Sequence, residues 1–163
     1  MVPFAKGDED GSFTSELVST LSSSGLGTVL HRHADYRLEV AILNDRNETI
    51  GFRRDPQKIE NKVKKNLLAI EGRKIIEVEA TVYRETSDEI VFGPYRLTAE
   101  ADYDYIDGDS LQELTFSYNG KLVSVLPFSL GQLEPIESAV EAATKPIYRR
   151  LSQKIVDVIS SEW

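Results

Sequence analysis

The chain has 163 residues, of which 40% are hydrophobic and 28% charged. That composition allows one globular domain, 1–163, with a sizeable core. With 27 acidic against 19 basic residues and a net charge of −8, the chain lacks the excess of Lys and Arg that general nucleic-acid binding requires. It has no cysteine, which excludes disulfides, thiolate metal sites and a cysteine nucleophile.

The first residues of the chain indicate how the protein is targeted to a cell compartment. The opening, Met-Val-Pro-Phe-Ala-Lys, is not a signal peptide, and no apolar run approaches the roughly 18 residues of a transmembrane helix. This start is typical of an initiator Met placed before a trimmed mature domain. We therefore expect a targeting or anchoring segment to precede Val2 in the full-length protein.

The first predicted elements are a short edge strand at 2–5 and a helix at about 13–24. Apolar residues at Phe13, Leu17 and Leu21 recur at helical spacing. Ser12 or Asp10 can cap the first amides, and Gly25 can end the helix.

Strict alternation of apolar and polar residues predicts strands in the middle of the chain. The segments, in order, are 35–43, 50–53, 73–85 and 94–105, with turns predicted at 44–49 and 86–89. Small residues at Ala99 and Ala101 leave room on the last strand for a packed helix.

The C-terminal part predicts a hairpin and a long helix. Asn119-Gly120 accepts positive φ at both positions and predicts a tight turn within an extra hairpin at about 111–126. Pro146 should kink the final helix or start its second part. The predicted apolar face of this helix consists of Ile136, Val140, Ala143, Ile147, Leu151, Ile155 and Val158.

This element order predicts an α+β fold: a two-layer sandwich with a mainly antiparallel sheet. Both terminal helices should pack on one face of the sheet, with the extra hairpin added. The other face is rich in Glu and Asp and should be wet or meet a polar partner.

A basic island, defined as residues 53–74, interrupts this acidic chain. It has eight basic and three acidic residues and a net charge of +5, which leaves −13 for the remainder. Clustered Lys and Arg would steer an anionic ligand to this segment, while the acidic remainder repels it elsewhere. The candidate ligand contacts are Arg53, Arg54, Lys58, Lys62, Lys64, Lys65, Arg73 and Lys74. The competing interpretation is a solvated loop of lysines.

The island's conformation stays open between two alternatives. Asp55-Pro56 can start a helix with Ile59, Val63 and Leu67 on one face. Alternatively, the island is a strand extension or a loop that joins two strands.

The sequence contains no strong motif for catalysis or metal binding. The chain has no G-x-S-x-G, P-loop or H-E-x-x-H motif. His31 and His33 could share one strand face as metal ligands, but two exposed histidines beside a turn are the simpler interpretation. The acidic segments 8–10 and 102–110 do not fit the positions of an EF-hand calcium loop. We expect a protein that is not an enzyme and has no cofactor.

Four stretches resemble the lipopolysaccharide-assembly lipoprotein family, LptE. They are "GSFTSELVSTLSSSG", "ADYRLEVAILNDRNETIGFR", "RKIIEVEATVYRETSDEIVFGPYRLTAEADYDY" and "YRRLSQKIVDVIS". Gly93-Pro94-Tyr95, which opens a strand, is most similar to chlamydial-type members. The family's lipidated N-terminal cysteine is missing from this sequence, and the hairpin at 111–126 is extra to the family plan.

The resemblance implies an outer-membrane lipoprotein on the periplasmic side, anchored through an N-terminal lipid. It implies a plug inside a large β-barrel partner, LptD, and binding of lipopolysaccharide on its way to the cell surface. The family's basic contacts lie in loops that match poorly here, so the island is assigned on charge alone. Two alternatives are an acidic protein-interaction adaptor without a lipid ligand and a metal-dependent hydrolase that uses the histidine pair.

Overall fold

The computed structural model describes residues 1–30, 32–59, 62–105, 115–124 and 136–162, and only the backbone of 53–59, 62–69, 115–118 and 122–124. It contains two helices and five strands within these ranges. The elements in chain order are α1 (Ser12–Ser24), β1 (Tyr36–Ile59), β2 (Lys62–Arg84), β3 (Glu89–Asp104), β4 (Thr115–Tyr118), β5 (Lys121–Ser124) and α4 (Ile136–Glu162). Neither described helix is long and apolar enough to cross a membrane.

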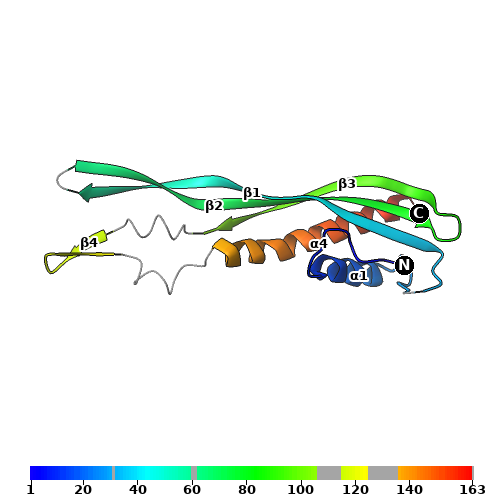
Figure 1. Ribbon diagram of the computed structural model, residues 1–163. Helices are drawn as coiled ribbons and strands as arrows, with labels where there is room; N and C mark the ends of the chain where they lie inside the picture. The colour runs from blue at the N-terminus through cyan, green and yellow to red at the C-terminus, as the bar shows by residue number, and fades with distance from the viewer. Residues whose placement is uncertain (31, 60–61, 106–114, 125–135, 163) are drawn as a thin grey trace. The chain divides into compact units, whose positions relative to one another are not determined.

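The predicted α+β fold is confirmed. β1, β2 and β3 form an antiparallel open sheet in that order (Figure 1). The chain divides into two compact units. The first unit is Met1–Arg46, Ile75–Ala101 and Thr144–Trp163, and the second unit is Asn47–Lys74 and Asp102–Ala143.

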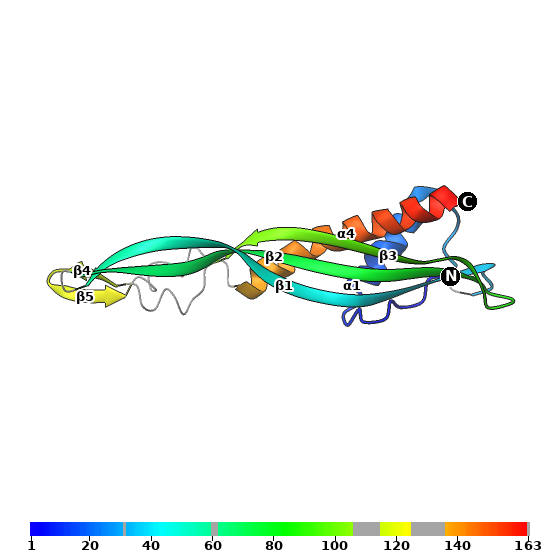
Figure 2. The ribbon, with the colours of Figure 1, turned by 90° about the horizontal axis from the view of Figure 1, so that it is seen from above.

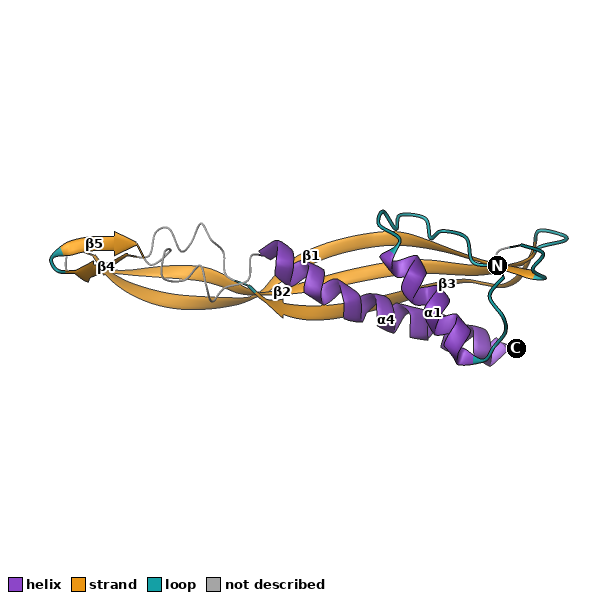
Figure 3. Ribbon diagram, turned by 90° about the horizontal axis from the view of Figure 1, so that it is seen from below, coloured by secondary structure: helices purple, strands orange, loops and turns teal. Residues whose placement is uncertain are grey.

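The first unit has two layers. Its part of the sheet lies in front of the helices when seen from above (Figure 2) and behind them when seen from below (Figure 3). One face of the sheet is therefore covered, as predicted. The core between the layers includes Phe13, Leu17, Leu38, Val40, Ile76, Val78, Ala80, Val82, Ala99, Ile147, Leu151 and Ile155. The period of two along β2 and of four along α4 places these residues on facing surfaces.

Two aspartates upstream of α1 complete its first turn. The carboxylate of Asp8 accepts hydrogen bonds from the Thr14 amide at 2.7 Å and the Thr14 hydroxyl at 2.6 Å. Asp10 accepts from the Ser12 amide at 3.0 Å. The sequence indicated Asp10 or Ser12 as the cap and missed Asp8, whose side chain reaches across six residues. Gly25 ends the helix with φ of 76°, as predicted.

The C-terminal helix runs through Pro146 as one element. Pro146 and Ala142 are both exposed, so the carbonyl that loses its helical partner lies on the solvent side. The predicted apolar face is right in its centre and less so at its ends. Ile136 is 43% exposed and Val158 is half-buried, whereas Val156 and Ile159 are buried.

Three sequence predictions are corrected by the strands. The predicted turn at 44–49 is wrong, because β1 continues through it; pairing with β2 outweighs the local turn chemistry. β3 begins at Glu89, five residues before its predicted start. The predicted strand at 2–5 is not a regular strand, although the neighbouring Lys6 forms a parallel bridge to Ala41.

Both edges of the sheet are covered in the first unit. At the β1 edge, the Leu38 amide donates to the Met1 carbonyl at 2.9 Å, and the Lys6 amide donates to the Val40 carbonyl at 2.8 Å. At the β3 edge, side chains of α4 donate to the carbonyls of Thr98 and Glu100, from Lys154 at 2.6 Å and from Arg150 at 2.7 Å. Covered edges are a common protection against unwanted strand pairing.

The extra hairpin is confirmed in its centre. β4 pairs with β5 antiparallel, with Tyr118 opposite Lys121. Asn119 and Gly120 have φ of 51° and 75°, which are the values that the Asn-Gly signal predicts. The outer parts of the predicted hairpin, 111–114 and 125–126, lie outside the described residues.

The buried hydroxyl of Ser152 leads to a stability prediction. Ser152 is fully buried, and its Oγ has no hydrogen-bond partner. A buried unpaired hydroxyl costs about 1 kcal/mol or more, and Ala also has the higher helix propensity. We expect Ser152→Ala to raise the free energy of unfolding by about 1 kcal/mol in a denaturant titration. In the control Ser160→Ala, at an exposed residue of the same helix whose hydroxyl donates to the Val156 carbonyl, we expect a change within about 0.5 kcal/mol. A loss of stability in Ser152→Ala would contradict the prediction.

Candidate functional site

The basic island forms the adjoining ends of two neighbouring strands. Arg53, Arg54 and Lys58 belong to β1, and Lys62, Lys64 and Lys65 belong to β2. The helix alternative is therefore wrong, and the strand alternative is right. Neighbouring strands lie about 4.8 Å apart, so the described backbone gathers six basic residues at the ends of β1 and β2 in the second unit. Only the backbone of these six residues is described.

The remaining two members of the island are already engaged. The Arg73 guanidinium forms two hydrogen bonds with the Asp102 carboxylate, at 2.6 and 3.0 Å. This pairing lowers the pKa of Asp102 below its usual value, chiefly through the hydrogen bonds from Arg73. Lys74 is 6% exposed. Arg73 therefore already has an anionic partner within the chain, and Lys74 presents little surface to a ligand.

Two tyrosines that follow Asp102 pack within the second unit. Tyr103 lies over Gly72 so closely that a Cβ at Gly72 would be 2.5 Å from the tyrosine Cζ. Tyr105 donates its amide to the Ile70 carbonyl at 2.9 Å, and its hydroxyl lies 3.3 Å from that of Thr49. This part of the segment 102–110 has a packing role, and 106–110 lies outside the described residues.

The acids near the N-terminus also have structural partners. Asp8 and Asp10 receive the amides of the first turn of α1, as described above, which accounts for their spacing without a calcium ion. His33 is exposed with φ of 55°, and His31 lies outside the described residues. Within the ranges that the structure describes, no three His, Asp or Glu residues gather in a way that could hold a metal ion.

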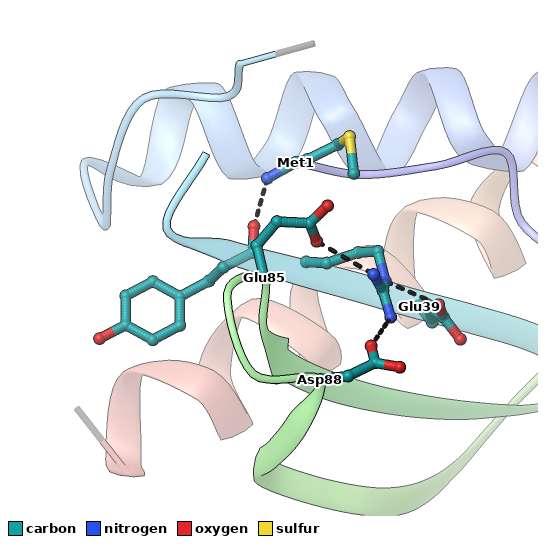
Figure 4. A network of polar contacts seen from close by, with 6 residues as sticks. Met1, Glu39, Glu85 and Asp88 are labelled. Carbon is teal, nitrogen blue, oxygen red and sulfur yellow. Dashed lines mark hydrogen bonds and ion pairs between the residues drawn. The ribbon is translucent and has the colours of Figure 1, made fainter. Parts of the chain in front are cut away.

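The uncovered face of the sheet carries an ion-pair cluster that the sequence did not predict. Arg37 contacts Glu39 at 2.8 Å, Glu85 at 3.0 Å and also Asp88 (Figure 4). Its guanidinium carbon lies 5.2 Å from the centre of the Tyr83 ring. The hydrogen bond to Asp88, followed by the nearby carboxylates, raises the pKa of Arg37 above its usual value. The available signal was the pair Arg37 and Glu39 on one strand face opposite an acidic turn.

A second ion pair lies on this part of the sheet. Arg96 contacts Glu79 at 3.2 Å, and the two side chains are 70% and 32% exposed. Exposed pairs of this kind contribute little to stability. With the cluster around Arg37, this pair gives the first unit a polar surface of mixed charge, where the sequence indicated a face rich in Glu and Asp.

Comparison with known proteins shows the fold. The chain is similar over 99% of its length to a putative lipoprotein from Caulobacter crescentus, with 12% identity, 88% of that chain covered and a TM-score of 0.54. A minor lipoprotein from Acinetobacter baumannii matches 98% of the chain, with 14% identity, 87% coverage and a TM-score of 0.51.

A third solved structure, rare lipoprotein B from Shewanella oneidensis, has 16% identity and a TM-score of 0.48 over 98% of this chain and 93% of its own. That likeness is too weak to carry an argument about function. No family model and no curated protein matches the chain.

Proposed function

We propose that this chain is a non-enzymatic envelope lipoprotein that assists lipopolysaccharide assembly at the outer membrane. In this role it lies on the periplasmic side, held by an N-terminal lipid anchor, docks in an LptD-like β-barrel and contacts lipopolysaccharide. The observation that carries the proposal is the full-length fold likeness to two proteins described as lipoproteins. The sequence resemblance to LptE supports the finer role.

The island supplies the proposed ligand contact. Because Arg73 pairs with Asp102 and Lys74 is buried, we assign the contact to the basic residues at the ends of β1 and β2. This segment, 53–66, has six basic and two acidic residues in a chain of net charge −8. Phosphate groups of lipopolysaccharide are suitable anions for such a cluster.

The polar face of the sheet supplies the proposed docking surface. Its ion pairs around Arg37 and Arg96 suit a wet, polar wall better than lipid. The opposite face is occupied by the chain's own helices in the first unit. A barrel lumen offers a polar wall of this kind.

The test is a charge reversal of three island residues, Lys62, Lys64 and Lys65, to Glu. At about 0.5–1 kcal/mol for each lost contact, we expect lipopolysaccharide to bind roughly 10–100-fold more weakly in a titration at low salt. Binding by the unaltered chain should weaken as salt increases, because salt screens exposed charges. Circular dichroism checks that the fold is retained.

The matched control reverses three exposed cations of the first unit: Lys6, Lys145 and Arg149. It changes the net charge by the same amount, so we expect only the general effect of added acidity, less than about threefold. Unchanged binding in the island variant, or equal losses in both variants, would refute the assignment to the island.

The second candidate is an acidic adaptor that binds a protein and no lipid, for which the ion-paired sheet face is the favouring observation. Co-purification with a protein partner together with no lipid binding by the unaltered chain would favour it.

A further inference from the structure

A partly open apolar pocket lies in the first unit, beside the start of the chain and the end of α4. Its volume is about 270 Å³. It is formed by the last part of α1, residues 26–30, the start of the chain, residues 34–38, the last part of β2 and the end of α4. The apolar side chains that shape it include Leu21, Leu26, Val29, Leu38, Val82 and Ile159.

The lining that the structure describes carries few charges. Among the lining residues that the structure describes, Asp35 is the one with a charged side chain, and none is Lys, Arg or His. The amino group of Met1 also borders the pocket, but it donates to the Tyr36 carbonyl at 2.6 Å (Figure 4). The Met1 amino group and the Asp35 carboxylate are thus opposite charges at the border of the pocket, and a head-group amine would pair with Asp35, which is exposed.

The volume of the pocket limits how wide a bound group can be. One turn of an α-helix about 10 Å wide fills about 400 Å³, so a partner helix does not fit. An apolar protein cavity of about 150 Å³ holds benzene. By proportion, 270 Å³ holds on the order of ten carbon atoms. A single acyl or alkyl chain meets both the size and the lining chemistry.

We propose that this pocket binds one acyl chain of an amine-bearing membrane lipid, with the head group near Asp35. This site is separate from the basic island, which belongs to the second unit, and it does not rest on the function proposed for the island. It would recognise the chain by length and the head by charge.

The test uses alkyl maltosides with six to fourteen carbons, each below its micelle-forming concentration, in calorimetric titrations. Each buried methylene should strengthen binding about fourfold. We expect this increase to continue to about ten carbons and then to stop as the chain fills the pocket. Affinity that does not depend on chain length, or that rises through fourteen carbons without a plateau, would overturn the proposal.

Two variants locate the site. Val29→Trp fills the pocket from its half-buried lining and should weaken decyl maltoside binding at least tenfold. The control Ile90→Trp adds the same ring at an apolar residue that is 50% exposed and outside the lining, and it should bind as the unaltered chain does. Equal binding by both variants would overturn the proposed location.

The head group is tested at a fixed chain length. Decylamine should bind more tightly than decyl sulfate, and Asp35→Asn should reduce that difference because it removes the carboxylate. If decyl sulfate binds as well as decylamine to the unaltered chain, the proposed head-group selection is wrong.

Discussion

Phe13→Ala should lower the free energy of unfolding by about 3–5 kcal/mol, the range for a phenylalanine removed from a well-packed core. Phe13 is fully buried, and its ring centre lies 5.1 Å from that of Tyr148 on α4. The substitution removes the main side chain by which the beginning of α1 contacts the core. At about 2–4 °C per kcal/mol for a chain of this size, the unfolding temperature should fall by roughly 6–20 °C.

The control is Phe4→Ala, which deletes the same ring nine positions earlier. Phe4 is 62% exposed, so we expect a loss below about 1 kcal/mol. Thermal unfolding of both variants, followed by circular dichroism, compares them directly. Similar losses in the two variants would mean that α1 does not depend on the buried ring.

Asp8→Ala should lower the free energy of unfolding by about 2–3 kcal/mol. Asp8 is 3% exposed, and its carboxylate accepts hydrogen bonds from two backbone amides and from the Thr14 hydroxyl. The variant would leave these donors without their acceptor at the positive end of the helix dipole. Burial, followed by the charges of Asp8, Asp10 and Asp45, raises the pKa of Tyr148 to about 12, so the variant should also lower the pKa of that tyrosine.

Two further variants separate the loss of hydrogen-bond acceptors from the loss of negative charge. Asp8→Asn keeps one acceptor oxygen, and we expect it to recover about half of the loss. Glu9→Ala removes the adjacent exposed acid and should change stability by less than about 0.5 kcal/mol. Denaturant titrations of the three variants measure the differences, and a loss in Glu9→Ala equal to that in Asp8→Ala would contradict the capping role.

Much of the fold was predictable because its signals are local. The helical spacing of Phe13 and Leu17, the Gly25 stop and the Asn119-Gly120 turn each depend on residues within one or two turns of the chain. Strict alternation also predicted the strand at 73–85, most of which lies in β2, because burial on one side of a sheet imposes a period of two.

Local signals failed where a distant strand decides the conformation. Asn, Asp and Thr at 44–49 indicate a turn, yet β1 continues through them because β2 supplies a partner along its length. The same pairing decides the island, whose helical and extended alternatives were balanced in the sequence.

The candidate site was predictable as a charge pattern and less so as a set of contacts. The sequence located the basic residues, but it could not reveal that Asp102 engages Arg73 across 29 positions. It also gave no reason to connect Val29 with Val82 and Ile159, which lie far apart in the chain and line the same pocket.

By itself, the sequence determined both helices, the centres of the main strands, the Asn119-Gly120 turn and the concentration of positive charge at 53–74, because these follow from spacing and composition. Only the tertiary structure decided which polar side chains are already paired with other groups of the chain. It places Lys154 and Arg150 on carbonyls of β3, Asp8 on amides of α1 and Asp102 on Arg73. Those partners are distant in sequence or depend on how the chain folds back, since a hydrogen bond depends on position in space and not on separation along the chain.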